Sequence, residues 1–174
     1  MRSDFILETP RLGLRRFVPE DAPAVASIFE DEEARRFFPE MHRLENAARW
    51  VRRNLESYDI DGIGLWAVIE KASGAFAGDC GLMFQPVGTA IEVEVGYHVR
   101  AAWRGRGIAS EAAAACMAWG FDRRGFPRII SLVHPDNTAS HGVAARIHRH
   151  VRRAERQGIL YFVYFTERPA AGGA

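Results

Sequence analysis

The chain has 174 residues, 48% of them hydrophobic and 26% charged, which is typical of a folded globular domain and excludes a disordered or fibrous chain. Lys and Arg total 23 against 22 Asp and Glu, so the net charge of +1 gives no overall reason to expect a nucleic-acid or membrane partner. The 2 cysteines and the lack of a long apolar run indicate a reducing, cytoplasmic setting without a membrane span, and the arginine-rich composition suggests a bacterial, GC-rich source.

The first part of the chain predicts one strand and then helices. Alternation around Leu12–Arg15 predicts a strand within residues 5–17 that ends at Pro19. Pro19 and the acids after it open a helix, because proline and negative charge are favoured in a first helical turn. Apolar spacing then predicts a short helix over 32–38 and an amphipathic helix over 44–58.

The middle and end of the chain predict a sheet covered by helices. Glycine and proline turns separate three strands, which indicates an antiparallel meander. The elements expected from here on are strands over 63–70, 76–84, 90–99, 128–133 and 158–165, and helices over 107–124 and 137–150. The sequence therefore predicts an α/β (α+β) domain over residues 1–168 with a mixed, mostly antiparallel sheet, followed by a disordered tail over 169–174.

The most informative stretch is a glycine-rich turn between a predicted strand and a predicted helix. Gly105 and Gly107 let main-chain N–H groups converge, and the next helix adds its positive N-terminal end, so an anion is favoured there. Arg104 and Arg106 add guanidinium donors that suit phosphate. A Walker loop is excluded because no Gly-Lys-Ser/Thr follows, and a dinucleotide motif is excluded because the third glycine is missing.

Arg104–Ala109 reads Arg-x-x-Gly-x-Ala, which closely resembles the pyrophosphate-binding motif of the GNAT superfamily of N-acetyltransferases. The opening, Leu7-Glu8-Thr9-Pro10-Arg11-Leu12 followed by Leu14-Arg15 and Glu20-Asp21, resembles that of the RimJ/RimL branch. Later stretches also match that branch in order, namely Gly78-Asp79-Cys80-Gly81-Leu82, Glu92-Val93-Glu94-Val95-Gly96-Tyr97 and Asn137-Thr138-Ala139-Ser140. The resemblance covers nearly the whole chain and implies a GNAT-like sheet flanked by helices.

The resemblance also implies a cofactor, acetyl-CoA, and the residues that would hold it. Backbone groups of the strand before the turn would bind the pantetheine arm, and the turn and helix start would wrap the pyrophosphate. The implied residues are Tyr97, His98 and Val99 for the arm, Arg104, Gly105, Arg106, Gly107, Ile108, Ala109 and Ser110 for the pyrophosphate, and Asn137 from the next helix start. The implied reaction is acetyl transfer to a primary amine, on a protein N-terminus or a small molecule, by direct attack in a ternary complex.

Two positions depart from the family pattern. Many members carry a tyrosine general acid seven residues after the asparagine, where this chain has Ala144. We expect Ser140 to take that role, because the RimJ/RimL branch commonly has serine there, although serine also starts helices for structural reasons. His148 replaces the usual glycine near the end of the same helix, which leaves the helix end and the adjoining pocket wall undetermined.

An amine must lose a proton before it attacks a thioester, since an alkyl ammonium has a pKa near about 10.4. Glu92 and Glu94 lie two residues apart on one predicted strand, so they share a face and are candidate proton acceptors, through water or a raised pKa. The alternative that they are solvated edge residues stays equally open. His98 is expected to serve packing or hydrogen bonding rather than to act as the base.

Other functions also stay open. Arg146, Arg149, Arg152, Arg153 and Arg156 could bind RNA or the ribosome, although such a run is more often a solvated helix face. A second alternative is an acyl-CoA-binding module without catalysis. The six histidines lack ligand spacing, so we expect no metal. The amine itself and the oligomeric state, a homodimer included, cannot be read from the sequence.

Overall fold

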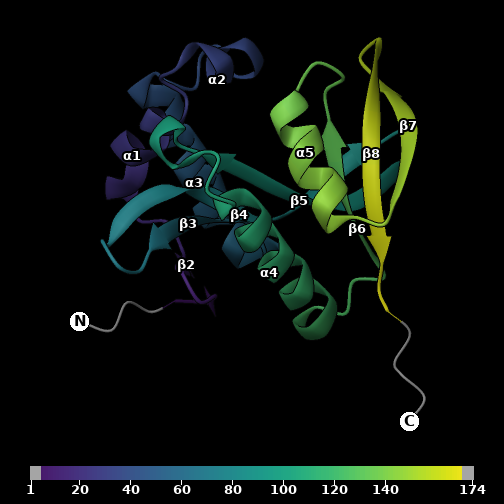
Figure 1. Cartoon of the computed structure of the whole chain (residues 1–174), viewed down its shortest axis with the longest axis horizontal. Helices are drawn as coiled ribbons and strands as arrows, with labels where there is room; N and C mark the ends of the chain where they lie inside the picture. The colour runs from purple at the N-terminus through teal and green to yellow at the C-terminus, as the bar shows by residue number, and fades with distance from the viewer. Residues whose placement is uncertain (1–4, 170–174) are drawn as a thin grey trace.

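The computed structural model describes residues 5–169 (Figure 1). Its centre is one eight-stranded sheet in the order β1-β2-β3-β4-β5-β6-β8-β7. The strands are β1 Leu7–Glu8, β2 Leu12–Arg15, β3 Leu65–Glu70, β4 Ala75–Val87, β5 Ala90–Val99, β6 Arg128–Val133, β7 His150–Arg156 and β8 Ile159–Glu167. All neighbouring strands are antiparallel except β5 and β6, which run parallel.

Five α-helices of the described residues flank this sheet, which confirms the predicted mixed, mostly antiparallel α/β fold (Figure 1). They are α1 Ala22–Ile28, α2 Glu32–Phe37, α3 Leu44–Ile60, α4 Ile108–Arg123 and α5 Thr138–Ile147, with single 3₁₀ turns at Pro19–Asp21 and Ala101–Trp103. The core between the helices and the sheet holds fully buried side chains such as Phe17, Phe29 and Leu65. Within residues 5–169, no helix combines the length and the apolar composition that crossing a membrane requires.

Two sequence predictions about the elements are wrong. The single strand expected within 5–17 is a hairpin, in which Leu7 pairs with Leu14 and a tight turn at Pro10 and Arg11 reverses the chain. The helix expected to reach residue 150 ends at Ile147, and the arginine-rich segment that follows forms the edge strand β7. The tail expected over 169–174 lies, apart from Pro169, outside the described residues.

The sheet opens between β5 and β6, and this opening positions the site. The two strands share one registered pair, Glu94 with Ile130. Beyond it β5 stays paired with β4 as far as Val99, whereas β6 pairs on its other edge with β8. The edges of β5 and β6 that face each other are therefore left without strand partners, and a gap forms in the middle of the sheet.

Candidate active site

A groove of about 1410 Å³ runs through this gap. Pockets for one small ligand usually measure about 300–1,000 Å³, so this groove has room for a cofactor and a second substrate. It is lined by β5, the glycine turn, the starts of α4 and α5, and by α1, α2 and α3. Of the residues expected in the site, all line it except Arg106 and Glu92.

The glycine turn has the backbone shape that the sequence predicts. Gly105 and Gly107 have φ angles of 74° and 75°, in the left-handed region that favours glycine. Gly107 is the N-cap of α4, and Ile108 and Ala109 follow as its first residues, so the free N–H groups of the helix start lie along the groove. The buried hydroxyl of Ser110 has no hydrogen-bond partner within residues 5–169. An oxygen-rich anion such as pyrophosphate would satisfy this hydroxyl and the N–H groups together.

The arginines of the turn are arranged differently from the expectation. The Arg104 guanidinium forms a two-pronged ion pair with Asp31, with both N···O distances at 2.8 Å, and a further contact with Glu33. This pairing raises the pKa of Arg104 and lowers the pKa of Asp31. Arg106 lies over the ring of Trp103, 5.0 Å from its centroid. The turn therefore offers main-chain groups to an anion, whereas the Arg104 side chain holds the start of α2.

A contact that the sequence did not reveal fixes the turn from outside. Arg11, in the β1–β2 turn, donates from Nη1 to the carbonyl oxygen of Arg106 at 2.9 Å and from Nε to Glu111 at 2.7 Å. Thr9 donates to the other oxygen of Glu111 at 2.5 Å. These hydrogen bonds from Thr9 and Arg11 lower the pKa of Glu111 against the opposing effect of burial. Thr9, Arg11 and Glu111 together form what we call the turn clamp.

The main chain of β5 is presented to the gap at alternate residues. The N–H of Arg100 donates to Ala77 at 3.0 Å, so the antiparallel alternation turns the main-chain groups of His98 toward β4 and those of Tyr97 and Val99 toward β6. The Val99 carbonyl accepts a hydrogen bond from Arg104 at 3.0 Å. Tyr97 therefore offers its main chain to a ligand, whereas the expected main-chain contact of His98 with a ligand in the gap finds no support.

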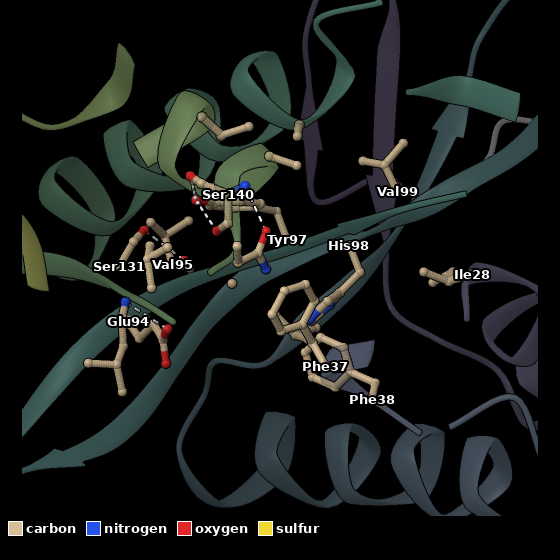
Figure 2. A pocket seen from close by; sticks show the side chains of 18 of the residues that line it. Ile28, Phe37, Phe38, Glu94, Val95, Tyr97, His98, Val99, Ser131 and Ser140 are labelled. Carbon is tan, nitrogen blue, oxygen red and sulfur yellow. Dashed lines mark hydrogen bonds between the residues drawn. The ribbon is translucent and has the colours of Figure 1, made fainter. Parts of the chain in front are cut away.

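Side chains from α5 and β5 meet on one face of the gap (Figure 2). Asn137 caps α5 by accepting from the Ser140 N–H at 3.0 Å. The Ser140 hydroxyl lies 3.1 Å from the Tyr97 hydroxyl, and the Tyr97 hydroxyl also lies 3.2 Å from the Ser140 carbonyl. Burial raises the pKa of Tyr97 to about 12. A tyrosine hydroxyl is thus present beside Ser140 although position 144 holds alanine, and it comes from the strand instead of the helix.

The two candidate carboxylates are separated by the structure. Glu94 lines the groove, where it accepts hydrogen bonds from Gln85 Nε2 at 2.8 Å and from the Leu132 N–H at 3.1 Å, and burial raises its pKa. Glu92 does not line the groove and forms ion pairs with Arg128 at 2.6 Å and Arg152 at 3.3 Å. Glu94 remains a candidate proton acceptor, and Glu92 holds β5 to β6 and β7.

His98 lies on the opposite face of β5 from Tyr97, toward α1, α2 and α3. Its Nδ1 is 2.7 Å from Oδ1 of Asp79, whose side chain is fully buried. The other oxygen of Asp79 accepts from Trp50 Nε1 at 3.1 Å. Neither Asp79 nor Trp50 was singled out from the sequence, because the register that places Asp79 opposite His98 is a property of the β4–β5 pairing.

His148 is buried directly after α5. It follows α5 in an extended conformation that does not require glycine, and it is 8% exposed. Its ring nitrogens lie 3.3 Å from the Thr166 hydroxyl and 3.0 Å from the Ser131 hydroxyl. Ser131 in turn donates to the carbonyl of Val95 at 3.2 Å. The departure from the family glycine therefore ties the end of α5 to β6 and β8.

Comparison with known proteins identifies the family. Residues 11–149 match the model of the acetyltransferase (GNAT) domain, so the chain belongs to the GNAT acetyltransferase family. It is 31% identical over 152 residues to the uncharacterized protein YkkB of Bacillus subtilis, spanning 87% of this chain and 88% of that protein. It is 30% identical over 139 residues to the uncharacterized N-acetyltransferase YoaA of the same species, spanning 78% and 77% of the two chains.

Solved structures share this fold. An acetyltransferase from Agrobacterium tumefaciens superposes with a TM-score of 0.79 at 26% identity, covering 92% of this chain and 93% of that one. RimL, a ribosomal-protein acetyltransferase solved with coenzyme A, superposes with a TM-score of 0.75 at 20% identity, covering 94% and 98% of the two chains. The protein is an acetyl-CoA-dependent N-acetyltransferase of this family.

Proposed function

We propose that the protein transfers the acetyl group of acetyl-CoA to a primary amine, on a protein N-terminus or a small molecule, by direct attack while both substrates are bound. The groove supports this proposal because it passes from the glycine turn, through the gap in the sheet, to the wall formed by α1, α2 and α3. One end is suited to the pyrophosphate and the other is open to a second substrate. We also propose that the protein acts on these substrates in the cytoplasm.

The single observation that carries the proposal is the unsatisfied donor set at the start of α4. The Ser110 hydroxyl and the free N–H groups after Gly107 line the same groove as the Tyr97 main chain. Acetyl-CoA supplies a thioester whose carbonyl carbon the amine attacks. We propose that the Tyr97 N–H, turned toward the gap, stabilises the developing oxyanion and that Ser140 gives the leaving thiolate a proton.

Glu94 is proposed to assist deprotonation of the amine. Its side chain lines the groove on a strand that borders the gap, and burial raises its pKa toward the range in which a carboxyl accepts a proton usefully. Its two hydrogen bonds hold the carboxylate in place. Glu92 has no part in this proposal, since Arg128 and Arg152 neutralise it outside the groove.

Binding of acetyl-CoA is tested by replacing Gly107 with valine. Valine is strained at a φ of 75° and would distort the start of α4, so we expect affinity measured by calorimetry to fall at least about 100-fold. Gly158→Val is the matched control, because Gly158 has a φ of 78° in the β7–β8 turn outside the groove and should leave the affinity within about twofold. Equal affinity of Gly107→Val and the parent would contradict the assignment.

Acetyl transfer itself is tested with a panel of primary amines and N-terminal peptides, with release of the free thiol as the readout. Turnover with any member supports the proposal. Tight binding of acetyl-CoA without turnover on the whole panel would instead favour a non-catalytic acyl-CoA-binding module. RNA binding through the arginine run is less well supported, because Arg152 pairs with Glu92 and Arg153 lies over the ring of Phe162.

A further inference from the structure

His98 and Asp79 form an ordered pair on the acceptor side of the groove. Asp79 has a fully buried side chain, so its carboxylate needs partners, and it has one on each oxygen. Oδ1 lies 2.7 Å from His98 Nδ1, and Oδ2 accepts from the Trp50 indole at 3.1 Å. A carboxylate fixed in this way favours the imidazole form that carries its proton on Nδ1.

Aromatic side chains hold the His98 ring on several sides. The rings of Phe29, Phe38 and Trp50 have centroids 5.4, 5.0 and 5.7 Å from that of His98, and those of Phe38 and Trp50 meet it edge to face. Figure 2 shows the ring pointing toward Phe37 and Phe38, away from Tyr97 and Ser140. The ring therefore has a single orientation, which the aromatic wall and Asp79 define together.

The remaining nitrogen is open to the groove. Nε2 of His98 has no hydrogen-bond partner within residues 5–169. It is not one of the buried polar atoms of these residues that lack a partner, so it is accessible from the groove. His98 lines the groove, and its side chain is 16% exposed. With Nδ1 turned to Asp79, Nε2 presents a lone pair to whatever enters from the α1, α2 and α3 side.

Acetylation removes two protons from an ammonium nitrogen, so the reaction needs two proton acceptors. One proton leaves before attack and the other leaves as the amide forms. Glu94 accepts two hydrogen bonds that hold its carboxylate at the β6 end of the groove, so it assists this step through water and is not the first acceptor. Imidazole is the side chain best matched to proton transfer near neutral pH. His98 follows Glu94 by four residues on the same face of β5. A strand rises about 3.3 Å per residue, so the Cα atoms of these two residues are about 13 Å apart.

We propose that His98, oriented by Asp79, is the catalytic base that takes the first proton from the acceptor amine. This assignment rests on the proposed acetyl transfer. An N–H bond of the ammonium breaks as the Nε2–H bond forms, which leaves a neutral amine and an imidazolium paired with Asp79. The amine attacks the thioester carbon, the C–N bond forms and the C–S bond breaks. The thiolate takes the second proton by way of Ser140, and the imidazolium returns its proton to water.

Other charged groups also contribute to the field at His98, and a pH profile must be interpreted with them. Asp79 on β4 contacts the ring directly, and Glu94 lies on β5. α1 contributes the uncharged Ile28 and Phe29 to the groove. The charged side chains that line it around His98 are Glu33 and Arg36 of α2, Arg53 and Glu56 of α3, and Arg104 of the turn, and Asp61, Asp136, Arg146 and Arg156 also line it.

The first measurement uses the wild-type protein with coenzyme A bound and needs no amine. Long-range proton–nitrogen NMR correlations report which ring nitrogen of His98 carries the proton. We expect the neutral ring to be protonated on Nδ1, with the Nε2 lone pair facing the groove. A neutral ring protonated on Nε2 overturns the proposal, because its lone pair would then face Asp79.

The second measurement is the pH dependence of kcat/KM with 2-phenylethylamine, putrescine and a peptide with a free N-terminus as probes. His98→Gln should lower kcat/KM at least about 100-fold and remove the acid limb of the profile, with acetyl-CoA affinity within about twofold of the parent. Asp79→Asn should lower kcat/KM about 10-fold, and Glu94→Gln should keep the acid limb. His141→Gln is the control, since His141 pairs with Tyr164 outside the groove and should behave as the parent.

The possible failures are separable. Turnover by His98→Gln within about threefold of the parent, with the acid limb intact, overturns the role of His98 and leaves acetyl transfer standing. No turnover of any probe by the parent, with acetyl-CoA tightly bound, overturns the proposed transfer and this role with it. Thermal melting of each variant checks that it is folded before its rate is interpreted.

Discussion

The hydrogen bond between the hydroxyl groups of Tyr97 and Ser140 determines how Ser140 can act as a proton donor. The Tyr97 hydroxyl can donate to the Ser140 carbonyl at 3.2 Å or to the Ser140 hydroxyl at 3.1 Å. When it donates to the hydroxyl, the hydrogen of Ser140 is free to point at the leaving thiolate. A thiol has a pKa near about 8.5 and leaves without strong acid help, so this donor needs to be only moderately effective.

We therefore expect Ser140→Ala to lower kcat about 10-fold to 100-fold with little change in acetyl-CoA affinity. Tyr97→Phe should have a smaller effect, and adding it to Ser140→Ala should cost nothing further, because the tyrosine acts through the serine. Single-turnover rates and calorimetry measure the two effects. Ser27→Ala is the control, since the Ser27 hydroxyl donates to the Ala24 carbonyl within α1. Intact turnover with weakened cofactor binding would assign Ser140 to the cofactor site and leave water as the proton donor.

At the scale of elements, the β1–β2 hairpin has a part in cofactor binding although it lies far from the turn in sequence. The turn contains two glycines in left-handed backbone conformations and would lose much conformational entropy on binding if it were free. The turn clamp of Thr9, Arg11 and Glu111 orders it beforehand by holding the Arg106 carbonyl and the first turn of α4. This gives a structural role to the Thr9-Pro10-Arg11 segment.

Removing the clamp should weaken cofactor binding without touching the cofactor. We expect Arg11→Ala to raise the Kd for acetyl-CoA about 10-fold, which is about 1.4 kcal/mol. Arg11→Lys should give an intermediate value, because lysine keeps the charge but cannot reach Arg106 and Glu111 together. Arg16→Ala, which removes an exposed ion pair to Asp59 and a cation–π contact with Tyr58 of α3, is the control. Calorimetric affinities of Arg11→Ala and the control that agree within error would show that the clamp has no such role.

At the scale of the molecule, the sequence predicts the elements better than it predicts their pairing. The three-strand meander, the strand over 128–133 and the glycine turn follow from local periodicity and turn residues, and the structure confirms them. Strand β7 was missed because its arginines do not alternate with apolar residues, as they would on a half-buried strand. The pairs Arg104–Asp31 and His98–Asp79 join residues 73 and 19 positions apart, so neither could be predicted without the sheet register.

His148 links three elements of the fold, and its burial makes the stability of the whole molecule depend on pH. The ring lies between Ser131 of β6 and Thr166 of β8, directly after α5. Desolvation lowers its pKa from 6.5 to about 4. In the unfolded chain the same side chain takes up a proton near its ordinary pKa, so the unfolded state holds more protons between these two values.

The free energy of unfolding should therefore fall as the pH drops from about 6.5 to about 4, by up to about 3 kcal/mol from this residue. Glu94 has the opposite effect on the free energy of unfolding. Because its pKa is raised in the folded protein, the folded state takes up a proton at a higher pH than the unfolded chain does. The carboxylates of lowered pKa, Asp31, Glu70 and Glu111, lose their contribution only as the pH falls further. Urea unfolding at pH 7, 6 and 5 measures this dependence across the range in which the histidine contributes. His148→Gln should flatten this dependence, whereas His150→Gln, at an exposed position on β7, should keep it. Parallel pH profiles for His148→Gln and the parent would mean that another group causes the acid sensitivity.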